Sequence, residues 1–152
     1  VEALEERLDA TRLDAEVARS TVVLDCSDNF ATRHAINRAC VKHRVPLVSG
    51  AAIRFDGQIS VFDLREADAP CYHCLFPEGQ DVEPVNCATM GVFAPLTGII
   101  GCTQAAEALK LVAGIGTSLN GRLLLLDALS MQWTTIGLAR DPGCPVCAMQ
   151  PE

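Results

Sequence analysis

Four cysteines in two identical spacings are the clearest chemical signal in the chain. Residues 71–74 read Cys-Tyr-His-Cys, and residues 144–147 read Cys-Pro-Val-Cys. A Cys-x-x-Cys turn can direct both sulfurs to one point, and two such turns supply the four thiolates of a closed tetrahedral zinc site. Because four protein ligands leave no open position, the predicted role of the zinc is structural. Its predicted ligands are Cys71, Cys74, Cys144 and Cys147.

Two alternatives are open for the same motifs. Cys-x-x-Cys pairs also occur in thiol oxidoreductases, and unreactive thiols simply pack in protein cores. A thiol oxidoreductase would contain no stoichiometric metal. His34, His43 and His73 have no partner at a metal-binding spacing. We expect His73 to lie at the surface, because four thiolates already fill the zinc.

A carboxylate and a guanidinium follow the first strongly apolar segment. Residues 21–26 are apolar and β-branched, as in a buried strand, and Asp28 comes soon after them. Binding sites in α/β folds lie at the carboxyl ends of parallel strands, so Asp28 could hold Mg²⁺ or orient a nucleotide phosphate. Its alternative role is to cap the helix expected over residues 29 to about 43. Arg33, in that helix, could reach a phosphate, although local sequence favours a solvated surface arginine.

A further cysteine, Cys87, follows a polar segment with two prolines at residues 77–86. The helix expected after Cys87 would lower the pKa of its thiol, which suits a nucleophile or a sulfur relay. Packing as a small buried residue is the alternative. The other three cysteines lie in apolar strand or helix patterns, and we expect them to pack: Cys26, Cys40 and Cys102.

The elements that position these residues form an α/β pattern. After the helix that ends near residue 43, residues 45–55 read as a second strand, which makes a βαβ unit. An Asp-Gly turn at residues 56–57 then predicts a hairpin with a strand over residues 58–62. Two further strands are expected over residues 121–127 and 130–136.

The run from residue 87 to 106 carries no charge, which raises the alternative of a membrane span. Glycines and a proline interrupt the run, and charged residues then continue its helical pattern. We therefore predict a buried helix over residues 93–112 in which Gly98 and Gly101 allow another helix, as in a dimer, to approach closely. Gly114 or Gly116 is expected to end it.

Bulk composition excludes several classes of protein. Hydrophobic residues make up 49% of the 152 residues and aromatic residues 5%, which is typical of an aliphatic core with buried strands. The net charge of −7 argues against sequence-independent binding to nucleic acid or to an anionic membrane. The start of the chain is charged and unlike a secretion signal, and the cysteine pattern suits a reducing compartment, so we expect a cytoplasmic protein.

Several stretches together resemble the ubiquitin-activating-enzyme-like adenylyltransferases, which include the bacterial molybdopterin-synthase and thiamine-pathway sulfur-carrier adenylyltransferases. The similarity runs from about residue 1 to 147. Residues 49–54 are closer to the molybdopterin branch, whereas residues 132–133 and the second cysteine motif are closer to the thiamine branch. The matching stretches are residues 24–29, Arg33, and residues 46–58, 71–74, 87–95, 104–110 and 143–147.

The resemblance implies a Rossmann-like, doubly wound α/β sheet with a zinc staple, in a homodimer. It implies that the C-terminal glycine carboxylate of a ubiquitin-like sulfur-carrier protein attacks the α-phosphate of ATP, releasing pyrophosphate before sulfur is loaded. Asp28 matches the family's Mg²⁺–ATP aspartate. Cys87 matches a cysteine that takes part in sulfur transfer in the thiamine branch. The four paired cysteines match the zinc ligands.

The family pattern also includes an N-terminal strand, a glycine-rich nucleotide loop and phosphate-binding Arg and Lys residues, which this sequence lacks. We therefore expect residues 1–152 to be a single domain, the C-terminal part of such an enzyme, and not to adenylate alone. The alternative is a non-catalytic, zinc-stapled module that docks a ubiquitin-like partner. An upstream glycine-rich loop would favour the enzyme, and a genuine Met start near Val1 would favour the module.

Overall fold

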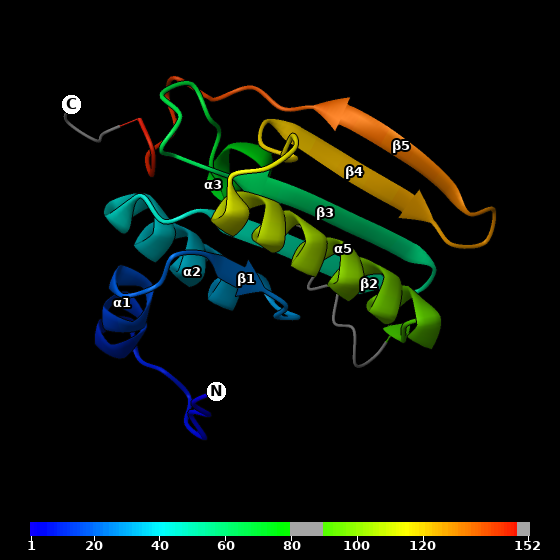
Figure 1. Cartoon of the computed structure of the whole chain (residues 1–152), viewed down its shortest axis with the longest axis horizontal. Helices are drawn as coiled ribbons and strands as arrows, with labels where there is room; N and C mark the ends of the chain where they lie inside the picture. The colour runs from blue at the N-terminus through cyan, green and yellow to red at the C-terminus, as the bar shows by residue number, and fades with distance from the viewer. Residues whose placement is uncertain (80–89, 149–152) are drawn as a thin grey trace.

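A computed structural model describes residues 1–79 and 90–148 of the chain and contains a five-stranded mixed sheet (Figure 1). The strand order is β1-β2-β3-β4-β5. The first pair, β1 and β2, is parallel, whereas the other three pairs are antiparallel. The expected α/β class is confirmed. The strands are β1 Val23–Asp25, β2 Leu47–Ile53, β3 Asp56–Phe62, β4 Arg122–Asp127 and β5 Gln132–Gly137.

Helix α2 (Phe30–His43) joins the two parallel strands, as the sequence predicted. The predicted cap was wrong, however. The side chain of Asn29, and not that of Asp28, accepts the backbone N–H of Thr32 at 2.8 Å. Arg44 ends the helix with a φ of 52°. Because Asn29 satisfies the first turn, the Asp28 carboxylate is not used as the cap.

The predicted hairpin between β2 and β3 forms, but its turn lies two residues earlier than the Asp-Gly signal indicated. Ile53 pairs with Asp56, so the turn consists of Arg54, at a φ of 49°, and Phe55. Gly57 lies within the strand, where a Cβ would come within 3.0 Å of two side chains of α5. The glycine therefore serves helix packing rather than the turn.

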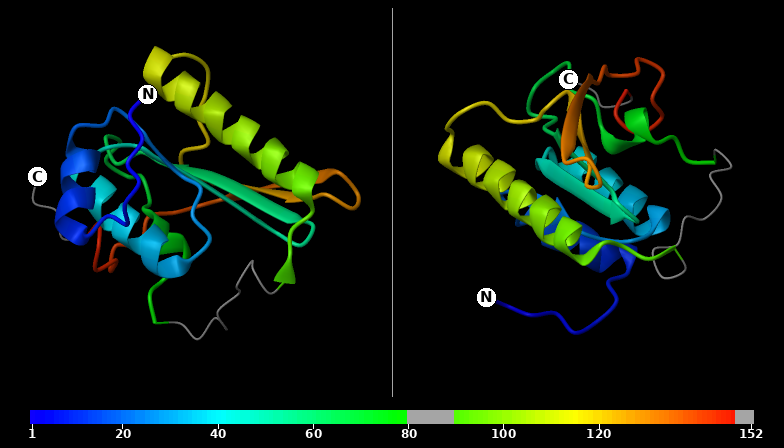
Figure 2. Two further views of the ribbon diagram at one scale, coloured as in Figure 1. Left: turned by 90° about the horizontal axis from the view of Figure 1, so that it is seen from below. Right: turned by 90° about the vertical axis from the view of Figure 1, so that its right-hand side faces the viewer.

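Helices cover both faces of the sheet, as the two views in Figure 2 show. Successive strand residues point to opposite faces, so Leu47 packs with α2 while Val48 packs with α5. The helix α5 (Ala94–Ala113) covers one face, and α1, α2 and α3 lie on the other. The other helices in the described part of the chain are α1 Ala10–Ala18 and α3 Tyr72–Leu75.

The observed α5 confirms the position of the helix predicted over residues 93–112, and Gly114 ends it at a φ of 64°. The predicted burial was wrong for the described chain, because only the side of α5 that faces the sheet is buried and most of its residues are exposed. Among the described residues, no helix combines the length and apolar character needed to cross a membrane. A Cβ on Gly98 or Gly101 would meet nothing within 4 Å. Within the described part of the chain, therefore, no helix packs closely on these two glycines.

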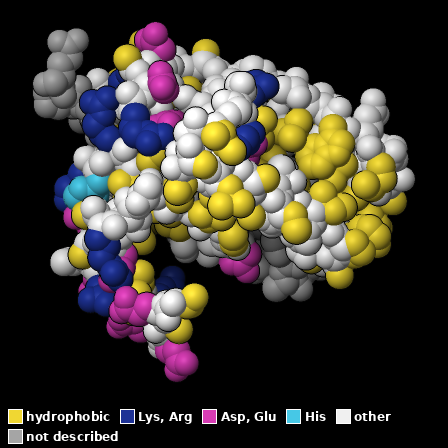
Figure 3. Space-filling model, in the orientation of Figure 1, with side chains coloured by type: hydrophobic (Ala, Val, Ile, Leu, Met, Phe, Trp, Pro, Cys, Tyr) yellow, Lys and Arg dark blue, Asp and Glu magenta, His cyan; other side chains and the backbone are white. Residues whose placement is uncertain are grey.

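Hydrophobic side chains lie exposed over α5 and the β4–β5 hairpin, whereas charges gather around the N-terminal segment (Figure 3). Every residue of β5 is exposed. The described chain thus leaves one end of its sheet open to solvent. The large exposed apolar residues here are Leu109, Val112, Ile115, Leu129, Met131, Trp133 and Ile136.

Candidate functional site: a cavity beside a four-cysteine cluster

A cavity of about 510 Å³ lies where β1 ends, bounded by α2, α5 and the β2–β3 hairpin. Asp28 and Arg33, the two residues expected to bind a nucleotide or its metal, both line it. The structure therefore brings these two candidates together. Parallel strands and the helix between them explain this placement, because their loops converge at the carboxyl edge of the sheet.

Arg33 is only 6% exposed, so the solvated surface arginine favoured by local sequence is wrong. Its Nη1 lies 3.2 Å from Ser49 Oγ and 3.4 Å from Asp25 Oδ2. Its Nη2 donates to the Gly50 carbonyl oxygen at 3.0 Å and to the carbonyl oxygen of Ser27. The guanidinium thus ties the end of β1 to β2 from beneath the cavity.

Asp25 is the buried partner of this arginine and was not singled out by the sequence analysis. It is 1% exposed and accepts hydrogen bonds from Ser27 N at 2.9 Å and from Ser27 Oγ at 2.6 Å. A buried carboxylate needs such partners, because losing water otherwise disfavours its charge. The sequence pattern that could have identified Asp25 is an aspartate at the end of an apolar run.

Gln104 of α5 holds the helix against the strands and was also missed as an individual residue. Its Nε2 donates to the carbonyl oxygens of Asp25, at 2.9 Å, and Val48, at 3.2 Å. A Cβ on Gly50 would lie 2.4 Å from Gln104 Cδ. The glycine therefore allows the close approach that these hydrogen bonds need. A polar residue inside an uncharged helical run was the signal for Gln104.

Asp28 differs from Asp25 because it is exposed at the cavity wall. Its Oδ1 accepts a hydrogen bond from the neighbouring Asn29 side chain at 3.3 Å. An accessible carboxylate next to a cavity can bind a hard cation such as Mg²⁺. Asp28 does not cap α2, so its carboxylate stays accessible at the cavity wall.

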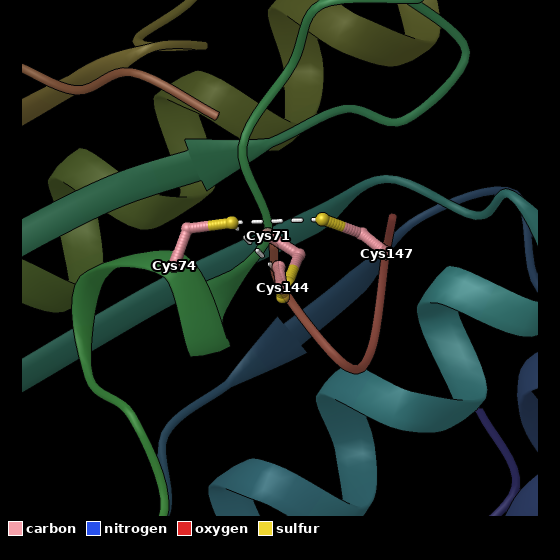
Figure 4. A group of neighbouring side chains, drawn as sticks. All are labelled: Cys71, Cys74, Cys144 and Cys147. Atoms are coloured by element: carbon pink, nitrogen blue, oxygen red, sulfur yellow. Dashed lines mark hydrogen bonds between the residues drawn. The ribbon is translucent and has the colours of Figure 1, made fainter. Parts of the chain in front are cut away.

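The four paired cysteines converge at one point, although the two pairs are far apart in the sequence (Figure 4). The sulfur–sulfur distances are 3.9 Å for Cys71–Cys74, 3.7 Å for Cys71–Cys144 and 3.5 Å for Cys74–Cys147. A tetrahedron with Zn–S bonds of about 2.3 Å has edges of about 3.8 Å. The arrangement therefore fits a tetrahedral metal ion held by four thiolates.

The surroundings of the cluster support a bound cation. Burial raises the pKa of Cys71, and burial likewise raises that of Cys147 to about 11. Burial also opposes ionisation of Cys144, but the backbone N–H groups of Cys147 and Val146 outweigh it and lower its pKa. Asn37 Nδ2 lies 3.6 Å from Cys71 Sγ, so the first motif has an outer hydrogen-bond partner. A divalent cation would keep all four sulfurs as thiolates.

His73, which we expected at the surface, is instead only 8% exposed. The helix α3 packs against α2, and the ring centroids of His73 and His34 lie 5.8 Å apart. Sequence spacing could not show this, because the two histidines come from different helices.

The remaining cysteines fall into three groups. Cys87, the candidate nucleophile, lies outside the described residues. Cys40 packs as expected, and burial raises its pKa to about 12. Cys26 and Cys102 are exposed, contrary to expectation. β1 ends at Asp25, so Cys26 lies beyond the strand at the cavity wall, whereas Cys102 lies on the outer side of α5.

The fold is that of several solved structures. The crystal structure of E. coli MccB with ATP covers 94% of this chain with a TM-score of 0.73, and the chain covers 44% of MccB. The sequences are 18% identical, so this likeness concerns the fold alone.

Sequence comparison gives a closer relationship. The SAMP-activating enzyme E1 of Haloferax volcanii is 45% identical over 97% of this chain and 54% of that protein. The sulfur carrier protein ThiS adenylyltransferase of E. coli is 47% identical over 95% of this chain and 57% of that protein. The E. coli molybdopterin-synthase adenylyltransferase is 46% identical over 92% of this chain and 55% of that protein. The chain thus spans about half the length of these relatives. A model of the ThiF family matches residues 1–146, so the chain belongs to the ThiF family.

Proposed function

We propose that the chain serves in the ATP-dependent adenylation of the C-terminal glycine of a ubiquitin-like sulfur-carrier protein, in molybdopterin or thiamine biosynthesis. The observation that carries this proposal is the cavity at the end of β1, where an exposed carboxylate, Asp28, lies next to a buried hydrogen-bond network. The names of relatives at 46–47% identity, a ThiS adenylyltransferase and a molybdopterin-synthase adenylyltransferase, support the same reaction.

The chemistry requires a carboxylate to be made a better electrophile. The carrier's terminal carboxylate attacks the α-phosphate of ATP, an acyl-adenylate forms, and pyrophosphate leaves. In this scheme Asp28 helps to hold the Mg²⁺ that offsets the charge of the departing pyrophosphate. Arg33 acts as a positioning residue, because its donors are directed to Asp25, Ser49 and two backbone carbonyls that shape the cavity.

The four cysteines are proposed to hold a structural zinc ion, since their spacing fits that ion and leaves no open position. Cys87 is proposed to take part in sulfur transfer. We further propose that the chain forms the C-terminal part of a doubly wound, homodimeric enzyme whose nucleotide-binding half is outside residues 1–152. The coverage of about half of each relative supports this division.

The test is carrier-dependent exchange between ATP and labelled pyrophosphate. The chain alone is expected to show none. Joined to the nucleotide-binding half of a ThiF-family relative, it is expected to support exchange only with a carrier that keeps its terminal glycine. Asp28→Asn should lower that exchange about a hundredfold, as the loss of a charge-stabilising group does. Asp68→Asn removes an exposed aspartate outside the cavity and should change nothing.

Two outcomes would contradict the proposal. If Asp28→Asn left the exchange rate of the joined protein unchanged, the Asp28 carboxylate would have no part in the reaction. Stoichiometric carrier binding without any exchange would favour the alternative, a non-catalytic docking module.

A further inference from the structure

A second group of metal-ligating side chains uses no cysteine, although one of its members, His73, lies within the first cysteine motif. It contains His34 of α2, His73 of α3 and Glu78, which follows α3. One ligand atom from each lies within 4.8 Å of the other two. Two imidazoles and one carboxylate are a ligand set that suits zinc and other first-row transition metals.

The two histidines are buried and held in place by aromatic neighbours. His34 is 5% exposed, and its ring lies against Phe30 and edge-on to Tyr72, at centroid distances of 6.4 and 5.3 Å. His73 is 8% exposed, and its Nδ1 is buried without a hydrogen-bond partner among the described residues. A buried imidazole nitrogen that has no hydrogen-bond partner has lost its interaction with water without gaining another. A bound ligand would supply the missing interaction.

The third residue supplies an exposed carboxylate. Glu78 is exposed, and its Oε1 lies 4.0 Å from His34 Nδ1. Arg38 donates to the same oxygen at 2.6 Å, and this hydrogen bond lowers the pKa of Glu78. Glu78 is therefore a carboxylate at neutral pH, and its two oxygens allow it to meet Arg38 and a metal together. Burial lowers the pKa of His34, which keeps that ring neutral and able to ligate.

We propose that His34, His73 and Glu78 bind a second divalent transition-metal ion, separate from the ion of the cysteine cluster. Metal–ligand bonds of about 2.0–2.1 Å place tetrahedral ligand atoms about 3.3–3.4 Å apart. A bound ion would require the 4.0 Å between Glu78 Oε1 and His34 Nδ1 to shorten slightly, and the exposed position of Glu78 leaves room for this adjustment. Three protein ligands leave a fourth position for water, and the ion links α2 to α3.

The experiment uses protein that carries zinc in its cysteine cluster and is titrated with Co²⁺. Elemental analysis should give one zinc and one cobalt per chain, and cobalt should show the weak visible absorption of nitrogen and oxygen ligation. Glu78→Gln should weaken cobalt binding at least about tenfold, since loss of even an outer partner of a metal has that effect. Zinc content should stay at one per chain, because Glu78 lies outside both cysteine motifs.

Two further variants make the test specific. His34→Gln removes a ligand on another helix and should weaken cobalt binding at least as much as Glu78→Gln. His43→Gln is the matched control, because His43 also belongs to α2 and pairs with a carboxylate, Asp14, at 3.0 Å. Its cobalt affinity should equal that of the unaltered protein.

Three results would overturn the proposal. The first is a protein that takes up no cobalt beyond its zinc. The second is an equal loss of cobalt binding in His43→Gln and Glu78→Gln, which would indicate general surface binding. The third is the intense absorption of cobalt bound to thiolates with a matching release of zinc, which would place cobalt in the cysteine cluster.

Discussion

The cysteine cluster and the cavity floor both join segments that are far apart in the chain, but they do so by different chemistry. The cluster brings the sulfur atoms of residues 71–74 to those of residues 144–147, and apolar side chains such as Leu64 and Val146 pack around them. The cavity floor joins β1, β2 and α5 through Asp25, Arg33 and Gln104, whose polar groups satisfy one another. The first arrangement would be completed by the proposed zinc ion, whereas the second is complete within the protein.

This difference predicts separate failures. Removing a metal should loosen the cluster and leave the cavity floor formed, and altering the floor should leave the metal bound. Each experiment below therefore alters either the cysteine cluster or the cavity floor and measures the effect on both regions.

The largest effect is expected from loss of the metal. Cys144→Ser, or a strong chelator, would remove the proposed zinc ion from the buried thiols, and structural zinc can contribute on the order of 10 kcal/mol to folding. We expect the free energy of unfolding, measured by urea denaturation, to fall by several kcal/mol. Limited proteolysis should cut first within residues 139–148, while cleavage that begins in β1 or β2 would contradict the separation.

The next largest effect is expected at the buried ion pair. Arg33→Met leaves the buried carboxyl group of Asp25 without its guanidinium partner, and breaking a buried pair in this way costs about 3–5 kcal/mol. The double variant Asp25→Asn, Arg33→Met should recover part of the loss, because the uncompensated charge is gone. Urea denaturation gives both values. Zinc per chain should not change, and its loss in Arg33→Met would show that the two regions are coupled.

Substitutions at two glycines are expected to change stability less, and Gly98→Ala serves as the control for Gly50→Ala. The Cβ of Gly50→Ala would meet Gln104 Cδ at 2.4 Å, and overpacking of this kind costs about 1–3 kcal/mol. Gly98→Ala adds the same atom where nothing lies within 4 Å, and in a helix it should stabilise by up to about 1 kcal/mol. Thermal unfolding compares the two variants. Equal effects would show that α5 does not depend on the Gln104 contact.

The smallest effect is expected in thiol labelling at pH 8, mapped by mass spectrometry, which in the untreated protein requires no loss of stability. Cys26 is exposed and should react, whereas Cys40 should not, because burial raises its pKa to about 12 and keeps it protonated. A chelator should add the four cluster cysteines to the reactive set and leave Cys40 protected. Labelling of Cys40 after chelation would mean that the loosening spreads into the core.

Local patterns predicted much of the fold. The spacing of apolar residues and the glycine at its end located α5, and alternation of strands with a helix located β1, α2 and β2. The cysteine motifs predicted the cluster because a Cys-x-x-Cys turn fixes its own geometry. In each case the information lay within a few neighbouring residues.

The features that were missed depend on distant partners. The burial of Arg33 follows from acceptors on β1 and β2, and that of His73 from the packing of α3 on α2. The turn forms at Arg54 and not at the predicted residues 56–57, because Gly57 lies within the strand and packs beneath α5. Local sequence reports none of these contacts, so it assigned both Arg33 and His73 to the surface.

The position of β1 at the edge of the sheet bears on how the protein behaves in concentrated solution. Among the described strands it pairs on one side, with β2, and its middle residue Leu24 is exposed. An open strand edge offers backbone donors and acceptors to any other extended segment. For residues 1–152 alone, strand addition is therefore expected at β1 as well as at β5, the other edge of the described sheet, and a lysine in place of Leu24 should lower aggregation at the β1 edge without touching the cavity or the cluster.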